Sequence, residues 1–109
     1  MQSMNGYQIT FFTQQNRLHD GKPLGEWLIL LARELNLPGA TLISGSEGIG
    51  HRHRIHSAHF FELTEQPQEV QMVGEEDSQR LFKKLKAEGV QVFYVKTPVE
   101  FGTLGEAES

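Results

Sequence analysis

The chain has 109 residues and a formal net charge of −4 at pH 7, and this length leaves room for one compact domain. It contains no cysteine, which excludes disulfide frameworks, zinc ribbons and cysteine nucleophiles and fits a reducing, cytoplasmic setting. No segment approaches the roughly 20 apolar residues that cross a bilayer, so we expect no membrane insertion. The negative charge also argues against nucleic acid as a partner.

The first predicted elements are a strand and a helix. Residues 7–13 alternate apolar and polar side chains, which is the pattern of a strand with one buried face. Pro23 favours a helix that starts near Lys22, and residues 38–39 (Pro-Gly) are expected to end it. Two further apolar residues, 29–30, lie where a subunit neighbour could cover them. The helix carries one apolar stripe that should pack on a sheet: Leu24, Trp27, Leu28, Leu31 and Leu35.

Two short β runs come next, at residues 40–44 and 58–63, and a glycine-rich, basic stretch at 45–57 separates them. This pattern predicts a hairpin with an unusually long loop. Compact hairpins close in about two to five residues, so a connection of about a dozen is where we expect function to lie. Pro67 breaks the second run, and strand structure is expected to continue over residues 69–73.

A second helix and a last strand complete the predicted elements. Acidic residues at 75–77 favour a helix N-terminus, and three lysines between positions 83 and 86 favour its C-terminus. Gly89 is expected to stop this helix, and residues 90–95 then form a last strand with both faces covered. The tail, 103–109, is expected to be disordered. The buried face of the helix is supplied by Leu81, Phe82 and Leu85.

The predicted order of elements is therefore β, α, β, β, α, β. This is the split βαβ arrangement of an α+β, ferredoxin-like fold, an antiparallel sheet with both helices on one face. We take residues 1–109 as a single domain with its core at about residues 6–102. Because this topology hosts many unrelated functions, the activity has to be argued from a site.

Six short segments stand out together: Gly6-Tyr7-Gln8 with Phe11-Phe12, Gly21-Lys22-Pro23-Leu24, Gly39-Ala40-Thr41, Glu47-Gly48-Ile49-Gly50, Ala58-His59-Phe60-Phe61-Glu62-Leu63 and Tyr94-Val95-Lys96-Thr97-Pro98. Over about residues 6–102 they resemble the bacterial domain of unknown function 190 family. That family is similar to the PII signal-transduction proteins, which are ferredoxin-like trimers. PII proteins bind adenine nucleotides between subunits and signal through a long loop after the second strand.

The resemblance implies a homotrimer and a set of ligand residues. Gly39 and Thr41 form a Gly-x-Thr that opens the second strand, and Gly48 and Gly50 form a Gly-x-Gly at the base of the long loop. The sequence departs from the PII pattern at two places. Residues 87–90 lack the lysine-containing phosphate loop of PII proteins, and the long loop has no tyrosine for uridylylation. Family members are often encoded near fluoride-exporting channels, which makes a membrane transporter or channel one class of expected partner.

The stretch 48–56 has the most unusual composition, with two arginines and three histidines behind two glycines. Backbone N–H groups together with Arg52 and Arg54 can hold a phosphate or a carboxylate. A second interpretation is a Zn²⁺ or Cu²⁺ site, although neighbouring arginines repel a cation. A third is a solvated loop for protein contact without any ligand. The metal site would use His51, His53 and His56, with His59 and His19 as further ligands.

Other candidates lie outside that stretch. Lys96, placed directly after the predicted last strand, could meet a phosphate-binding loop of the same or a neighbouring subunit, or lie free on the surface. Arg17, His19 and Asp20 lie where a catalytic loop could sit, but no second carboxylate, nucleophile elbow or phosphate-loop motif accompanies them. We therefore predict a non-enzymatic sensor that binds a small anionic effector, such as an adenine nucleotide, and signals through residues 45–57.

Overall fold

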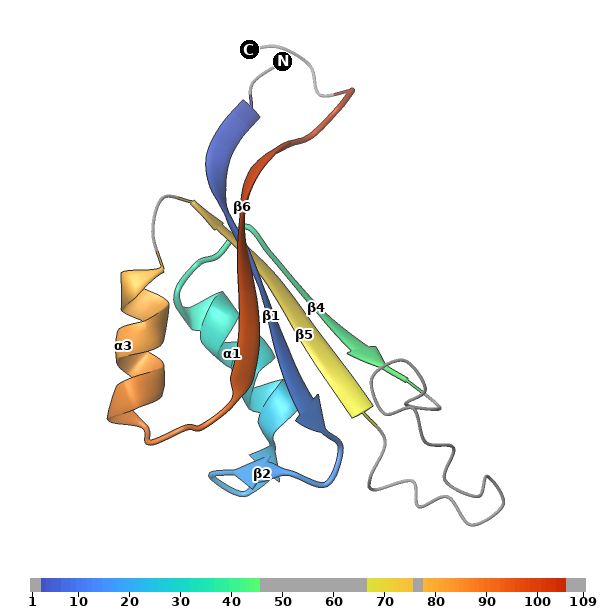
Figure 1. Cartoon of the computed structure of the whole chain (residues 1–109), viewed down its shortest axis with the longest axis vertical. Coiled ribbons are helices and arrows are strands. Elements are labelled where there is room, and N and C mark those ends of the chain that lie inside the picture. The colour runs from blue at the N-terminus through green and yellow to red at the C-terminus, as the bar shows by residue number, and fades with distance from the viewer. Residues whose placement is uncertain (1–2, 46–66, 76–77, 106–109) are drawn as a thin grey trace.

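The structure is a computed structural model that describes residues 3–45, 67–75 and 78–105. Figure 1 shows how its elements are arranged. The four long strands are β1 (Ser3–Gln14), β4 (Gly39–Ser44), β5 (Pro67–Glu75) and β6 (Phe93–Gly102). The helices are α1 (Leu24–Glu34) and α3 (Gln79–Ala87), and a small hairpin consists of β2 (Leu18–His19) and β3 (Lys22–Pro23).

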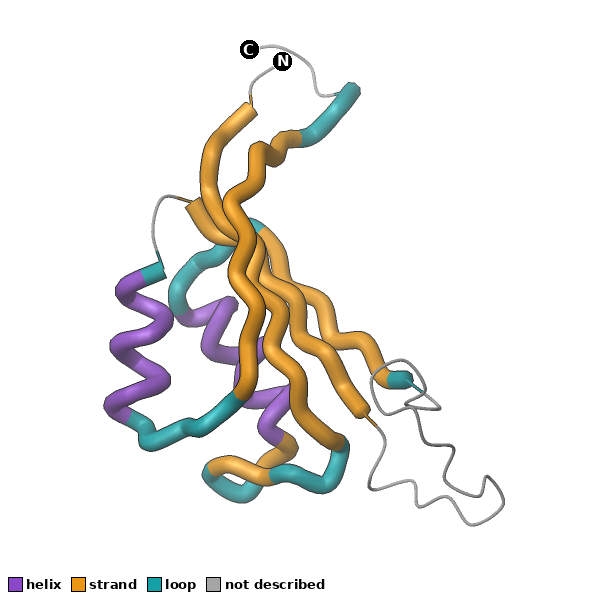
Figure 2. Tube along the Cα trace, in the orientation of Figure 1, coloured by secondary structure: helices purple, strands orange, loops and turns teal. Residues whose placement is uncertain are grey.

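The long strands form one sheet in the order β4-β5-β1-β6, and every neighbouring pair is antiparallel. Figure 2 shows them side by side along most of their length. In chain order, α1 connects β1 to β4, and α3 connects β5 to β6. This is the ferredoxin-like topology, and it confirms the predicted α+β fold.

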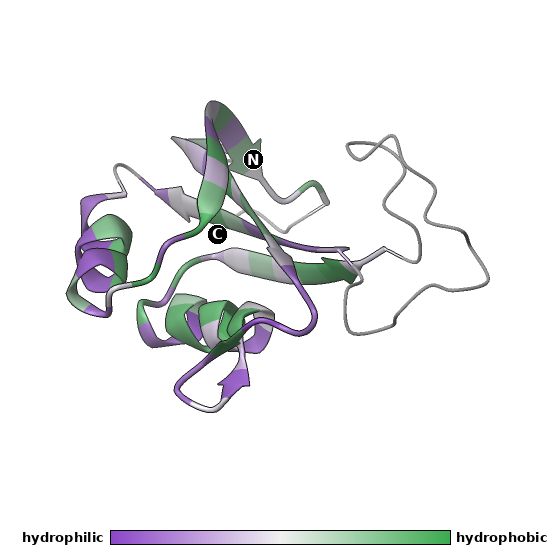
Figure 3. Ribbon diagram, turned by 60° about the horizontal axis from the view of Figure 1, so that its bottom comes forward, coloured by the Kyte–Doolittle hydropathy of each residue, from purple (hydrophilic) through white to green (hydrophobic). Residues whose placement is uncertain are grey.

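The core lies between the helices and the inner face of the sheet. Alternate residues of β1 and β5 point inward, as the period of two predicts. The apolar stripe of α1 packs on them, and α1 carries more of the hydrophobic colour in Figure 3 than α3 does. The side chains with less than 2% exposure are Ile9, Phe11, Leu24, Leu28, Val70, Met72 and Leu81.

The bounds of α1 differ from the prediction at both ends. Helix α1 begins at Leu24, and Pro23 is its N-cap. It ends at Glu34, before the expected Pro-Gly stop, because Asn36 takes a left-handed conformation with φ 59°. Asparagine tolerates this conformation better than most residues. Gly89, with φ 71°, follows α3 as predicted.

The partner of β4 is β5, paired from Gly39 with Val73 to Ser44 with Gln68. The run at 58–63, which was expected to pair with residues 40–44, lies outside the described part of the chain. Pro67 opens β5 instead of breaking a strand, which fits a residue that has no N–H to donate. The connection between the two strands covers residues 45–66, of which 46–66 lie outside the described part of the chain.

The last strand was expected at residues 90–95, but β6 begins at Phe93 and runs to Gly102. Val90 and Val92 precede it and pack against the core as partly buried residues. The expected burial on both faces is also wrong for the single chain, because β6 is an edge strand and its outer face is bare. Phe93 is 69% exposed and Val95 is 47% exposed.

The segments next to α3 and β6 also differ from the prediction. Glu75 ends β5 and does not begin a helix, and Ser78 is the N-cap of α3. Of the tail expected to be disordered, residues 104–105 form a turn. Residues 106–109 lie outside the described part of the chain.

Candidate functional site

One end of the sheet carries three of the candidate functional residues, Arg17, His19 and Asp20, in and before the β2–β3 hairpin. It is the lower end in Figure 1, where β2 is labelled. Strand β1 ends there, the β2–β3 hairpin leads into α1, and α3 turns toward β6. Strands β4 and β5 meet residues 45–66 at the same end, where the Gly45 N–H donates to the Pro67 carbonyl oxygen at 2.9 Å. The long connection is thus closed at its base by a backbone hydrogen bond.

An open cavity of about 500 Å³ lies at this end, beside the start of β6. Its apolar wall is a pair of rings, Phe12 and Phe93, whose centroids are 5.6 Å apart. Its polar lining includes Thr13, Arg17 and Gln91, and the Arg17 guanidinium donates a hydrogen bond to the Gln91 carbonyl oxygen. The volume is in the range of small-molecule sites, and the lining offers one cation beside aromatic surface.

Two buried polar side chains lie next to this cavity. Thr13 and Gln68 face each other across β1 and β5 and are 8% and 7% exposed. Within the described residues, neither Thr13 Oγ1 nor Gln68 Oε1 has a hydrogen-bond partner, whereas Gln68 Nε2 donates to Ser44 Oγ at 3.3 Å. A Cβ at position 25 would lie 2.9 Å from Gln68 Oε1 and 3.0 Å from Leu42 Cδ1, so a larger residue there would require these side chains to shift. Buried polar atoms without partners are uncommon and mark a place where a further group can bind.

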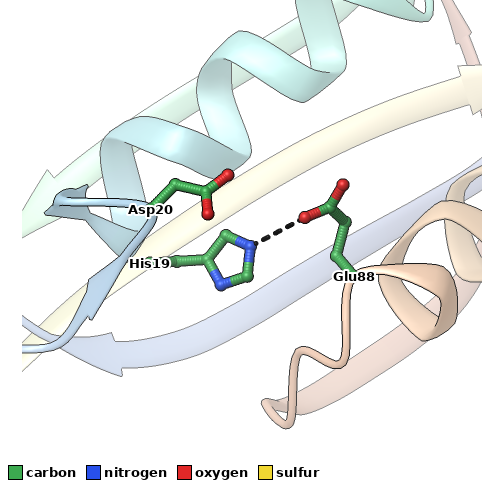
Figure 4. Close-up of side chains that lie close together, drawn as sticks. All are labelled: His19, Asp20 and Glu88. Atoms are coloured by element: carbon green, nitrogen blue, oxygen red, sulfur yellow. Dashed lines mark hydrogen bonds and ion pairs between the residues drawn. The ribbon is translucent and has the colours of Figure 1, made fainter.

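A third cluster joins the β2–β3 hairpin to the end of α3. His19 Nε2 lies 3.1 Å from Glu88 Oε1, and the Asp20 carboxylate lies on the same side of the ring (Figure 4). One ligand atom from each of the three residues lies within 4.8 Å of the other two. The His19 ring meets Trp27 edge-on, with centroids 4.5 Å apart. Sequence reasoning found His19 and Asp20 but not Glu88, because 69 residues separate His19 from its partner.

The His19 contact should be visible in the titration of Glu88. The hydrogen bond from His19 holds the pKa of the Glu88 carboxyl below its ordinary value, burial opposes this effect, and Lys84 adds to the lowering. The stabilising contribution of this carboxylate is therefore present above its ordinary pKa and is lost as the pH falls through the lowered one. We expect His19→Phe, which keeps a ring against Trp27, to raise the pKa of Glu88.

The measurement is a titration of the side-chain carboxyl carbons by NMR. Glu100 is the control, because it accepts a hydrogen bond from Ser3 Oγ at 2.6 Å and has no contact with the hairpin. A Glu88 midpoint that does not move in His19→Phe would contradict the assignment of the shift to His19.

The predicted ligand residues that the structure describes are not gathered within one chain. Gly39 and Thr41 open β4 as predicted. Lys96 is not placed after the last strand but lies within β6, where its Nζ donates to Ser78 Oγ at 2.7 Å and lies 5.3 Å from the centroid of the Tyr7 ring. Because β4 and β6 are opposite edges of the sheet, a shared site of these residues would need a second subunit.

The remaining predicted site residues lie outside the described part of the chain. They are the anion-binding candidates Gly48, Gly50, Arg52 and Arg54, and the metal-binding candidates His51, His53 and His56, together with His59.

A solved structure has the same fold as this chain. It is the crystal structure of a proposed PII-like signaling protein from Thermus thermophilus, with a TM-score of 0.57 and 17% identity. The match covers 93% of this chain and 91% of that one. At this identity the likeness establishes the fold and leaves the function to be argued from the site.

Sequence comparison gives the family. No curated protein matches the chain, and none of the helices in the described residues is long and apolar enough to cross a membrane. The model of the family DUF190, described as an uncharacterized ACR, matches residues 6–99. With nearly the whole chain matched, this protein belongs to the DUF190 family.

Proposed function

We propose that this chain is a PII-like regulatory protein of the cytoplasm and not an enzyme. It binds a small anionic effector, such as an adenine nucleotide, at the interfaces of a homotrimer, and it signals to a protein partner through residues 45–57. The observation that carries the proposal is the cavity beside Arg17, at the end of the sheet where the long connection leaves it.

The lining of the cavity suits an anion attached to a ring. Arg17 has a planar guanidinium with five donors, and its one hydrogen bond in the described structure, to the Gln91 carbonyl oxygen, leaves others for a phosphate. The half-buried Phe12 and the exposed Phe93 give a base a surface on which to stack. These are the two kinds of contact that a nucleotide needs.

The position of the cavity suits a signalling role. Gly45 and Pro67, which close the base of the long connection, lie where β4 ends and β5 begins, and Pro67 also lines the cavity. An effector held there can contact Gly48, Gly50, Arg52 and Arg54 and shift the conformations that this segment presents to a partner. The partner class that the family context suggests is a membrane transporter or channel.

The outer face of the sheet supports the trimer. Across the sheet, Ile43 pairs with Glu69, Glu69 with Phe12, and Phe12 with Phe93, so all four side chains lie on the face opposite the helices. Val95 lies on the same face, opposite Thr10. A face that combines exposed aliphatic and aromatic residues with few charges is typical of a subunit interface. A site that combines Gly39 and Thr41 of one chain with Lys96 of another would form where the β4 edge of one subunit meets the β6 edge of the next.

A thermal-shift panel on metal-free protein tests the proposal. Adenine nucleotides, inorganic phosphate, bicarbonate, Zn²⁺ and Cu²⁺ are added singly at saturating concentration. A ligand at 100 times its dissociation constant adds about 2.7 kcal/mol to the free energy of unfolding, which is several degrees for a domain of this size. We expect one adenine nucleotide to raise the melting temperature and phosphate alone to leave it unchanged.

Variants locate the site. We expect Arg17→Ala to remove most of the nucleotide shift, and the pair Arg52→Ala with Arg54→Ala to weaken it. Arg33→Ala is the matched control, because Arg33 is an exposed arginine in the last turn of α1 and should leave the shift unchanged.

Other results would replace this function. A shift with Zn²⁺ or Cu²⁺ alone that is lost in His51→Ala with His53→Ala would favour a metal-binding protein that uses the loop histidines. No shift with any anion or metal would favour an interaction module without a ligand.

A further inference from the structure

One imidazole and two carboxylates lie close together outside the cavity beside Arg17, which we call the effector cavity. They belong to His19, Asp20 and Glu88 (Figure 4). Imidazole nitrogen with carboxylate oxygen is the donor set of Zn²⁺ and other first-row divalent ions, whereas Mg²⁺ and Ca²⁺ prefer oxygen alone. We propose that these three side chains form a binding site for a first-row divalent metal ion, separate from the histidines at 51–56.

The distances fit such an ion with a small movement of one side chain. Two ligand atoms, each about 2.0–2.1 Å from a tetrahedral ion, are about 3.3 Å apart. His19 Nε2 and Glu88 Oε1 are already 3.1 Å apart, and the three ligand atoms lie within 4.8 Å of one another. Asp20 is exposed and forms no ion pair among the described residues, so its carboxylate is able to close the remaining gap.

Two structured elements hold the ligands in place. His19 belongs to the β2–β3 hairpin, where its backbone pairs with Lys22, and its ring rests edge-on against Trp27. Glu88 is the C-cap residue of α3. The side chains of His19 and Glu88 are 19% and 31% exposed, so the site is sheltered but open to an incoming ion. A bound ion would join two segments that are far apart in the sequence.

The charges at the site favour a divalent cation but include one competitor. The two carboxylates balance the charge of a divalent ion and the imidazole is neutral when it acts as a ligand. Lys84 lies one turn before Glu88 on α3, with its Nζ 3.7 Å from Glu88 Oε2. This ammonium repels a cation and occupies one carboxylate oxygen, so an incoming ion has to displace it.

Calorimetric titration of the metal-free, full-length protein with Zn²⁺ tests the site, and the visible spectrum of bound Co²⁺ reports its coordination. We expect one Zn²⁺ per chain from this site, and at least tenfold weaker binding in Asp20→Asn and in Glu88→Gln. Asparagine tolerates the left-handed backbone at position 20, where φ is 54°. Glutamine keeps a hydrogen-bonding side chain beside His19. Circular dichroism confirms that each variant is folded.

Two pairs of variants separate this site from its alternatives. Lys84→Met should strengthen Zn²⁺ binding several-fold, whereas Lys83→Met, one residue earlier on an exposed position, should leave it unchanged. The triple variant His51→Ala, His53→Ala and His56→Ala should keep the affinity of the site. The proposal is overturned if the wild type does not bind Zn²⁺, if Asp20→Asn and Glu88→Gln bind as tightly as the wild type, or if the triple variant abolishes binding.

Discussion

Replacing both Phe93 and Val95 by aspartate is expected to convert the proposed trimer into monomers of 12.4 kDa. Both side chains lie on the outer face of β6, and they are 69% and 47% exposed in the single chain. Their exposure means that the folded monomer loses little packing when they are changed. An aspartate at each position would leave an unpaired charge at the centre of a subunit interface, which costs several kcal/mol per site.

Sedimentation equilibrium gives the mass in solution, and Leu30→Asp is the matched comparison. Leu30 is 43% exposed on α1. The sequence had suggested that a neighbouring subunit could cover this side chain. We expect Leu30→Asp to keep the trimer. If Leu30→Asp yields monomers and the β6 variant does not, the subunits meet through their helices and not through the open face of the sheet.

Local periodicity was enough to predict most of the elements. The alternation in residues 7–13 identified β1, and the stripe from Leu24 to Leu35 identified α1, because each pattern reports directly which side of the element is buried. Gly89 identified the end of α3, since it is the residue type that most readily takes the left-handed conformation found there.

The errors occurred where pairing between distant segments decides the structure. Residues 90–95 alternate like a strand. Val90 and Val92, however, belong to the segment that connects α3 to β6 and pack against the core from there. Strand β6 begins only at Phe93, which pairs with Phe12 of β1. The register between these strands is set by contacts between residues about 80 positions apart, and such contacts leave no local signal in the sequence. For the same reason the sequence could not show that β4 pairs with β5 across an interval of more than 20 residues.

The cavity was not predicted from the sequence. The long connection at 45–57 was expected to carry function, and it lies mostly outside the described residues, whereas the cavity is lined by residues of β1, β5 and the segments before α1 and β6. The contacts that build the site join Arg17 to Gln91 and His19 to Glu88, and each pair is at least 69 residues apart in the sequence. Spacing rules identify ligands within one helix, strand or loop, so they could not bring these residues together.

Removing a buried hydroxyl that has no hydrogen-bond partner is expected to raise the stability of the protein and to weaken effector binding. Thr13 Oγ1 is buried and has no hydrogen-bond partner among the described residues. Thr13→Val has nearly the same shape and removes the polar group, so we expect the unliganded protein to gain about 1 kcal/mol in free energy of unfolding. Thr13 also lines the effector cavity. If the bound effector, or a water molecule held by it, forms a hydrogen bond with this hydroxyl, the same variant should bind the effector more weakly.

Urea unfolding with and without the effector identified by the thermal-shift panel measures both changes. Thr10→Val is the control, because Thr10 is on the same strand but on the outer face, half-buried and away from the cavity. We expect it to change neither quantity by more than about 0.5 kcal/mol. A gain in stability with undiminished binding would mean that the effector leaves the hydroxyl unpaired. A loss of stability in Thr13→Val would mean that a group of the unliganded protein already pairs with the hydroxyl, and the buried pair of Thr13 and Gln68 would then belong to the fold and not to the binding site.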